Sequence, residues 1–302
     1  MDKKRKKLRI SDKLHYWLMV LPAVVLVFLF NTRTWPGILA AFQDFIPVRG
    51  WYGSKWVGLR NFRIFFMQPN CWQIIQNTLV MAIGKIVGVQ FLAIVFALMI
   101  NEVRNSKLKR FIQTFTYLPH FISWVIFATI LRSILGTDGL MNQILTNLGR
   151  ESYSFLGTPS IFQPLMIVTE MLKEFGWSAI IYLSALTGID PGLYEAAEID
   201  GATRWRQTVH VTLPGIRYII VLNGVLSLGG ILNGGFDQIF NMYNTLVMST
   251  ADIIDTWVYR QGILSLNYGV GTAVGLFKSA IAMVLTVFAY WAADRFADYK
   301  IF

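Results

Sequence analysis

Apolar residues form six long runs along the chain, and charged residues are rare inside these runs. A helix that crosses a bilayer needs about 20 predominantly apolar residues. Six stretches meet this requirement, at 14–33, 77–100, 111–131, 162–186, 214–232 and 270–293. The pattern therefore predicts an all-α membrane protein with six transmembrane helices.

The overall composition agrees with this prediction. The chain is 55% hydrophobic and only 15% charged, whereas a soluble domain has about 45–50% apolar and about 25% charged residues. The first apolar run also differs from a secretory signal. It continues without a charge from Leu14 to Phe30, which is longer than the usual apolar core of such a signal, and Asn31, Arg33 and Trp35 follow in place of a small-residue cleavage site. We expect a retained anchor.

The distribution of basic residues predicts the orientation. With the N-terminus inside, the segments 1–13, 101–110, 187–217 and 294–302 hold 16 of the 27 Lys and Arg residues, and the outer segments hold eight. Because cytoplasmic loops are enriched in Lys and Arg, both termini are predicted to be cytoplasmic. Residues 1–13 then form a basic cytoplasmic segment, and 14–302 form a single transmembrane domain. The net charge of +10 is thus a topology signal, and no nucleic-acid partner is expected.

Several kinds of chemistry have no support in the sequence. The chain has one cysteine, Cys71, and three histidines without metal-ligand spacing, so no metal site is expected. It contains no GxxxxGK[ST] phosphate-binding motif and no loop long enough for a nucleotide-binding domain. We therefore expect a non-catalytic chain without cofactors of its own.

The inner loop between the fourth and fifth runs, at about 187–214, has an unusual sequence. Asp190 followed by Pro191 is a typical helix start. Gly201 permits a sharp bend, and Pro214 is predicted to end a second short helix and to begin the fifth run. The loop is therefore predicted to be a rigid helix–bend–helix element, which we call the coupling loop.

The composition of the coupling loop suggests two roles. Its apolar residues can dock into the groove of a partner protein; they are Leu193, Tyr194, Ala197 and Trp205. The alternative is a helix lying on lipid headgroups. Four acidic residues make this alternative weak, because they would face an anionic leaflet; they are Asp190, Glu195, Glu198 and Asp200.

At these residues the chain resembles the EAA-motif permeases of bacterial ABC importers, in particular those for sugars and oligosaccharides. The motif is matched by Glu195, Ala196, Ala197, Asp200, Gly201, Ala202, Leu213 and Pro214, with Leu213 12 residues after Gly201. Shorter matches occur at 41–45, 56–62, 77–79, 117–119, 176–177 and 255–260, so that the resemblance covers nearly the whole chain.

The resemblance implies a type I ABC importer permease fold in the bacterial cytoplasmic (inner) membrane. It implies a second, homologous permease subunit, two ATPase subunits that hold ATP and Mg, and an extracytoplasmic solute-binding protein. The coupling loop would insert into an ATPase subunit. The substrate would be a sugar, in this subgroup an oligosaccharide.

Polar residues inside the runs are candidates for the substrate pathway. Glu170, Lys173 and Glu174 share one face of the fourth run, with Trp177 nearby. Asn233 and Asp237 lie near the outer end of the fifth run. These six residues could line a sugar pathway, but a Glu170–Lys173 pair that only joins helices is an equally good interpretation. For Lys85 and Lys278 we favour the structural interpretation.

The first outer loop is basic, with Arg49, Lys55, Arg60 and Arg63. It could attract an acidic binding protein or an acidic oligosaccharide. Its Trp51, Tyr52 and Trp56 also fit a loop that rests at the membrane interface, which is the interpretation we favour.

Two other function classes predict features that the sequence lacks. A secondary transporter would show broken helices at matching positions of two similar halves, and the sequence has no such internal symmetry. An intramembrane enzyme would need a nucleophile or metal constellation, and none is visible.

Overall fold

The computed structural model describes residues 10–297, with side chains for 14–32 and 35–291. The predicted basic segment 1–13 lies outside the described side chains. The first half contains α1 (Ile10–Phe30), η1 (Thr32–Phe42), β1 (Gln43–Asp44), η2 (Pro47–Arg49), α2 (Gly50–Gly53), β2 (Lys55–Trp56), α3 (Arg60–Phe66), α4 (Cys71–Asn101), α5 (Ser106–Tyr117), η3 (Leu118–Phe121), α6 (Trp124–Leu135) and α7 (Leu140–Asn147).

The second half contains α8 (Pro159–Thr187), α9 (Pro191–Ile199), α10 (Arg204–Gln207), η4 (Thr208–Thr212), α11 (Leu213–Leu228), α12 (Phe236–Met242), η5 (Thr245–Val247), α13 (Met248–Ala251), α14 (Ile254–Val258), η6 (Tyr259–Leu264) and α15 (Tyr268–Ala297). β1 and β2 pair antiparallel, with Gln43 opposite Trp56. Residues 10–297 are thus mainly helical, with strands only in this small hairpin, as the apolar runs predict.

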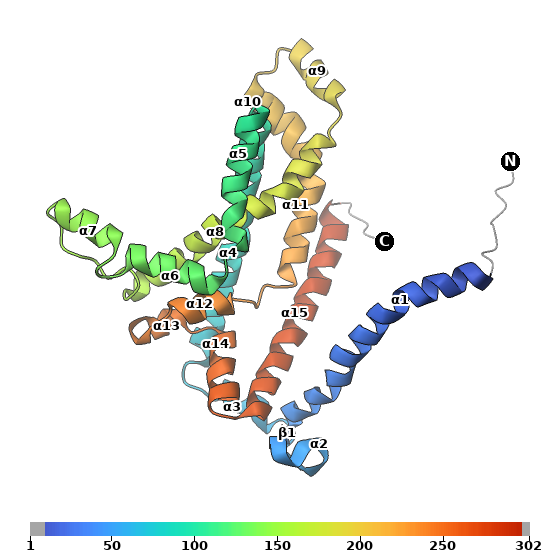
Figure 1. The fold of residues 1–302 in the computed structure, drawn as a ribbon, viewed down its shortest axis with the longest axis vertical. Coiled ribbons are helices and arrows are strands. Elements are labelled where there is room, and N and C mark those ends of the chain that lie inside the picture. The colour runs from blue at the N-terminus through green and yellow to red at the C-terminus, as the bar shows by residue number, and fades with distance from the viewer. Residues whose placement is uncertain (1–9, 298–302) are drawn as a thin grey trace.

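The helices α4 and α8 form the centre of the molecule (Figure 1). Gly84 and Gly88 are spaced by four residues on α4, and this small-residue spacing lets two helix backbones approach closely in a membrane. A side chain at Gly84 would collide with Ile167 of α8, and a Cβ at Gly88 would lie 2.6 Å from Sδ of Met171. The close approach places the residue between them, Lys85, against α8.

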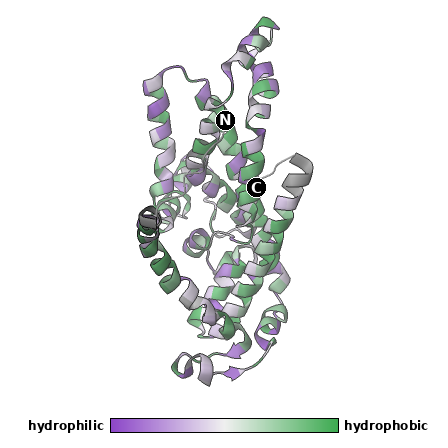
Figure 2. Ribbon diagram, turned by 90° about the vertical axis from the view of Figure 1, so that its right-hand side faces the viewer, coloured by the Kyte–Doolittle hydropathy of each residue, from purple (hydrophilic) through white to green (hydrophobic). Residues whose placement is uncertain are grey.

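Five helical segments among the described residues are long and apolar enough to cross a membrane: Leu14–Phe42, Cys71–Asn101, Trp124–Asn147, Arg204–Leu228 and Tyr268–Trp291. The 29-residue helix α8 is not among them. Its charged residues Glu170, Lys173 and Glu174 lower its mean hydropathy. It nevertheless packs along α4, which is itself one of the five candidate spans. Figure 2 shows apolar residues along the long helices and hydrophilic ones toward the two ends.

The prediction of a continuous third span at 111–131 is wrong. The chain leaves the α-helix at Leu118, passes through the short turn η3, and starts α6 with Ser123 as N-cap, whose Oγ accepts from the N–H of Ile126. Pro119 explains the break, because proline removes a helical N–H and clashes with the preceding turn. In Figure 1, α6 and α7 project sideways from the bundle, while α5 stays with it and packs against α8.

The fifth run is also interrupted, at its outer end. Helix α11 stops at Leu228, and the chain continues without α-helix through 229–235, a segment we call the glycine-rich break. Gly235 has φ +86°, a backbone conformation that favours glycine. Helix α12 then packs on α6 and α8 around the buried residues Phe162, Met166, Ile239 and Met242.

The two ends of the bundle carry different structures. Helices α9 and α10 lie at one end, and the β1–β2 hairpin with α2 lies at the opposite end (Figure 1). Helix α1 stands apart from the bundle and joins it through η1. Every described side chain of α1, from Leu14 to Phe30, is exposed.

Candidate functional site

The coupling loop is built from local helix-capping interactions. Asp190 is the N-cap of α9, with Oδ1 accepting from the N–H of Gly192 at 2.9 Å, and Pro191 occupies the first helical position. These interactions satisfy donors that a helix start otherwise leaves unpaired. The predicted helix start is confirmed.

The end of α9 is a Schellman motif. Gly201 has φ +72°, its N–H donates to the carbonyl of Glu198 at 3.0 Å, and the N–H of Ala202 donates to the carbonyl of Ala197 at 2.9 Å. This bond pattern requires a residue in the left-handed conformation just after the helix, usually glycine. Thr203 then caps the next helix. The predicted bend at Gly201 is confirmed.

The expected role of Pro214 is wrong in one respect. No helix ends there: α10 continues through the wider π-helical turns of η4 into α11. The N–H of Leu213 donates to Thr208, five residues back. Proline cannot donate the usual bond to the carbonyl four residues before it, and the wider turns precede this position. As a result, the second arm of the coupling loop and α11 are one uninterrupted rod.

The coupling loop is held at a fixed angle but presents apolar groups to the outside. The hydroxyls of Tyr194 on α9 and Thr212 on η4 lie 3.0 Å apart in a hydrogen bond across the bend. Leu193, Ile199 and Trp205 are exposed, Ile199 by 87%. A groove of about 410 Å³ lies between the two arms. Glu195 and Ala196 are exposed on α9, Ala197 is half-buried, and Asp200 and Ala202 line the groove.

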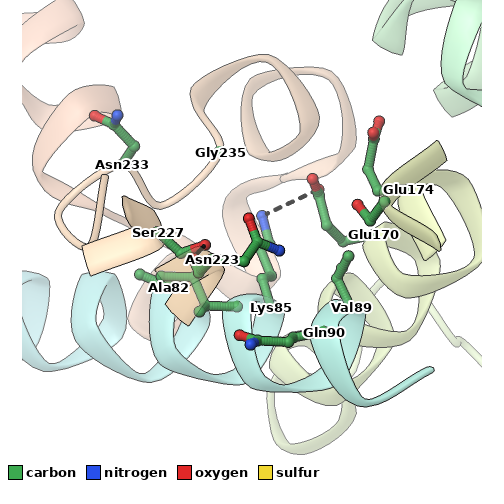
Figure 3. A pocket seen from close by; sticks show the side chains of 12 residues that line it. Ala82, Lys85, Val89, Gln90, Glu170, Glu174, Asn223, Ser227, Asn233 and Gly235 are labelled. Atoms are coloured by element: carbon green, nitrogen blue, oxygen red, sulfur yellow. Dashed lines mark hydrogen bonds and ion pairs between the residues drawn. The ribbon is translucent and has the colours of Figure 1, made fainter. Parts of the chain in front are cut away.

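A second candidate site is a cavity of about 340 Å³ in the middle of the bundle, which we call the polar pocket. It is lined by residues of α4, α8, α11 and the glycine-rich break: Ala82, Lys85, Ile86, Val89, Gln90, Glu170, Glu174, Ser178, Asn223, Ser227, Asn233 and Gly235 (Figure 3). Uncharged hydrogen-bonding groups make up much of this lining, together with one lysine and two glutamates.

The charged residues near the polar pocket pair in a way the sequence did not predict. Glu170 does not pair with Lys173. Its Oε2 lies 3.7 Å from Nζ of Lys85 on α4, while Nζ of Lys173 donates to Oε1 of Glu174 at 2.8 Å. The other oxygen of Glu174 lies 2.6 Å from Nδ1 of His120. Spacing along one helix could not reveal these partners, because two of them come from other helices.

The structure brings only part of the predicted pathway set together. Glu170, Glu174 and Asn233 line the polar pocket. Lys173 is buried beside it, with Nζ also donating to the carbonyl of His120 at 3.0 Å. Trp177 stacks on the His120 ring with centroids 4.5 Å apart.

Asp237 lies in the first turn of α12 and is not among the residues that line the polar pocket. The glycine-rich break explains its position, because it separates Asp237 from the helix that the apolar run suggested.

Other lining residues were not singled out from the sequence. Gln90 donates to the carbonyl of Ile220 at 2.9 Å, and Asn223 donates to the hydroxyl of Tyr182 at 3.0 Å. Lys85 was assigned a structural role. An uncharged polar residue in an otherwise apolar run, such as Gln90, is the signal that could have identified this lining.

A partly buried ion pair joins the end of α13 to η6, outside the long helices. Arg260 donates to both oxygens of Asp252, at 2.9 and 2.6 Å. The hydrogen bonds with Asp252 raise the pKa of Arg260 above its ordinary value. Near it, Nζ of Lys278 on α15 donates to Asp255 at 2.6 Å, which confirms a structural partner for this lysine.

Comparison with known proteins identifies the family. Residues 90–298 match the model of the binding-protein-dependent transport system inner membrane component. The polygalacturonan/rhamnogalacturonan transport system permease protein YteP of Bacillus subtilis (strain 168) is 39% identical over 99% of this chain and 95% of its own length. Protein LplB of the same organism is 39% identical over 95% of this chain and 90% of its own length.

The fold comparison agrees. A chain of a bacterial ABC transporter involved in the import of the acidic polysaccharide alginate superposes with a TM-score of 0.88 and 34% identity, covering 95% of this chain and 97% of that one. Its complex with an alginate pentasaccharide-bound periplasmic protein gives the same TM-score. The apolar helices, the capped coupling loop and these matches lead to one conclusion: the chain belongs to the family of binding-protein-dependent transport system inner membrane components.

Proposed function

We propose that this chain is one of two membrane-spanning subunits of an ATP-powered importer and that it passes an oligosaccharide across the bacterial cytoplasmic membrane. An extracytoplasmic binding protein delivers the sugar, and two ATPase subunits supply the energy. ATP and Mg bind those ATPase subunits, so this chain catalyses no reaction and needs no cofactor. The relatives that share 39% identity and the alginate importer chains support this assignment.

The coupling loop is the observation that carries the proposal. A short helix capped at both ends stands clear of the bundle and exposes Leu193 and Ile199. Such a rigid amphipathic element fits the groove of a partner protein. We assign coupling to Glu195, Ala196, Ala197, Asp200, Gly201, Ala202, Leu213 and Pro214. The first six form α9 or the turn that ends it, and the last two begin α11, where the coupling loop ends.

The proposed topology has six spans and two cytoplasmic termini. Helix α8, added to the five candidate spans, gives six, and the segment Trp124–Asn147, which begins with α6, is the third of them. The segments predicted to be cytoplasmic, one of which contains α9, hold most of the Lys and Arg residues. The exposed helix α1 supports a second, homologous permease subunit, because an apolar helix that stands off its own bundle can pack on a neighbouring one.

We propose that the polar pocket is part of the sugar pathway. Hydroxyl groups of a sugar can donate to carboxylates and exchange hydrogen bonds with amide side chains. Glu170, Glu174 and Asn233 offer such groups. Lys173 and Trp177 support the lining indirectly, since Lys173 binds Glu174 and Trp177 stacks on His120. We assign Asp237 to the outer approach of the same pathway.

Purification and reconstitution test the assignment. The chain, co-expressed with its partner subunits, should co-elute with an ATPase and import oligosaccharide into proteoliposomes only when ATP and a sugar-loaded binding protein are present. Elution without any ATPase subunit, or uptake driven by an ion gradient alone, would contradict the proposal.

The substrate is proposed to be acidic. The alginate importer chain shares 34% identity and handles an acidic polysaccharide. The exposed Arg49, Lys55 and Arg60 of the outer loop add positive charge at the entry side. A uronic-acid oligosaccharide should be imported about tenfold faster at low concentration than the same oligosaccharide with its carboxylates reduced to alcohols. Equal rates would show that charge is not recognised.

A further inference from the structure

The glycine-rich break separates two halves of the fifth run that are fixed in different ways. Before the break, α11 is bound to α4 by the Gln90 amide and to α8 by the Asn223–Tyr182 hydrogen bond. After the break, α12 is bound to α8, since the buried Gln238 amide donates to Met166 and Thr169 at 2.8 Å each. The non-helical segment 229–235 is the connection at which these two halves can move relative to each other.

Lys85 holds this break in its present position. Its side chain is only 8% exposed, and Nζ donates to the carbonyl of Gly234 at 2.7 Å. A side chain at Gly235 would collide with the same Nζ, so this glycine leaves the space that the ammonium group occupies. Among the described residues, this is the one hydrogen bond that joins a backbone group of the break to α4. The close approach of α4 to α8 at Gly84 and Gly88 sets the position of Lys85.

A second possible acceptor for Nζ of Lys85, the carboxylate of Glu170, lies beside this contact. Oε2 of Glu170 is buried, lies 3.7 Å from Nζ of Lys85, and accepts no hydrogen bond from the described residues. That distance is too long for a hydrogen bond. Glu174 does not compete for the lysine, because its two oxygens contact Lys173 and His120. Figure 3 shows Lys85 and Glu170 facing each other, with the break beside them.

We propose that Lys85 is a positioning residue that changes partner during transport. In the described state Nζ binds the carbonyl of Gly234 and holds the glycine-rich break against α4. In the other state Nζ moves to Oε2 of Glu170, which frees the break and lets α11 and α12 shift around the polar pocket. Because this oxygen is buried and accepts no hydrogen bond from the described residues, Nζ can bind it at little cost. This proposal rests on the proposed transport function.

The two partners of Lys85 should then have opposite effects. Lys85→Met removes the contact in both states, so the break opens more often. Glu170→Gln removes the charged acceptor, so the contact with Gly234 lasts longer. An ion pair with a purely structural role predicts the same direction for both variants, since each breaks the same pair.

Thiol labelling of Asn233→Cys, in the full complex with Cys71→Ala, measures the opening directly. Asn233 lines the polar pocket within the break. We expect labelling about tenfold faster with Lys85→Met and about tenfold slower with Glu170→Gln, as expected when a hydrogen bond to a charged group is lost or retained. Basal ATPase activity should rise and fall in the same order. Lys278→Met, which removes another paired lysine, should leave labelling unchanged.

Changes in the same direction, or no change in either variant, would overturn the proposal. If Lys85→Met fails to assemble, Glu170→Gln decides alone: slower labelling supports the proposal, and equal or faster labelling overturns it. Labelling does not require a transported sugar. A wild-type complex that imports no oligosaccharide would therefore refute the proposed function without deciding the role of Lys85.

Discussion

At the scale of single residues, Gly201 determines the shape of the coupling loop. Its φ of +72° reverses the chain, and the two hydrogen bonds of the Schellman motif depend on this conformation. A Cβ placed there would meet no atom within 4 Å. The requirement for glycine is thus conformational, since an L-residue in the left-handed region costs about 1–2 kcal/mol.

Substitutions of Gly201 should reduce coupling in order of their conformational cost. Gly201→Asn should be mild, because asparagine tolerates the left-handed region; Gly201→Ala should cost about 1 kcal/mol. Gly201→Pro should abolish coupled uptake, because it fixes φ near −65° and removes the N–H that binds Glu198. The ratio of sugar uptake to ATP hydrolysis in proteoliposomes measures the effect.

Gly149 provides a matched control for this series. It also has φ +72° and open space around its Cβ position, but it follows α7, away from the coupling loop. Gly149→Ala should therefore lower stability by a similar amount without changing the uptake ratio. Normal coupled uptake in Gly201→Pro would show that the bend is not used.

At the scale of helices, the contact between α4 and α8 organises the membrane-embedded part. Gly84 and Gly88 allow the two backbones to approach, and this brings Lys85 to Glu170. The chain therefore uses two small residues to build a polar contact between helices that are far apart in sequence. The wide turns of η4 act at the same scale, since they keep α10 and α11 in one rod despite Pro214.

Enlarging Gly84 should separate these helices. Gly84→Leu places a large side chain where Ile167 lies, and overpacking of this kind typically costs about 1–3 kcal/mol. We expect a lower melting temperature for the purified complex and partial recovery when Ile167→Ala is added. Gly275→Leu on α15 is the control, because nothing lies within 4 Å of its Cβ position. Equal destabilisation by both leucines would contradict close packing at Gly84.

The elements that the sequence predicted correctly are those with local causes. Asp190, Pro191 and Gly201 lie within a dozen residues, and each acts on its neighbours, so the first helix and the bend of the coupling loop could be predicted. Pro119 is also local, but its effect was missed because the apolar run continues through it. The Lys85–Glu170 contact joins residues 85 positions apart, and no pattern along one helix encodes it.

At the scale of the whole molecule, the coupling loop and the outer hairpin lie at opposite ends of the bundle (Figure 1). The polar pocket lies between them, at the end of the rod formed by α10, η4 and α11. A displacement of the coupling loop can thus be carried to Asn223 and Ser227 without bending a flexible linker. The separation of the ends also makes the topology directly measurable.

Thiol labelling should place the two ends on opposite sides of the membrane. Tyr52 is fully exposed beside the hairpin, and Ile199 is 87% exposed on α9. With Cys71→Ala as background, Tyr52→Cys should react with a membrane-impermeant maleimide in intact cells after removal of the cell wall, whereas Ile199→Cys should react only after permeabilisation. Labelling of both positions from the outside would refute the proposed orientation.

The detached position of α1 has a consequence for biosynthesis. If α1 packs on a second permease as proposed, a subunit made alone would leave this apolar helix with lipid as its neighbour, and the second permease would lack the surface that α1 covers. Surplus copies of either chain would then be recognisable to membrane quality-control proteases, which degrade unassembled subunits. The cell would then need to produce the two proposed permeases in matched amounts, because each copy of α1 needs one partner surface to pack on.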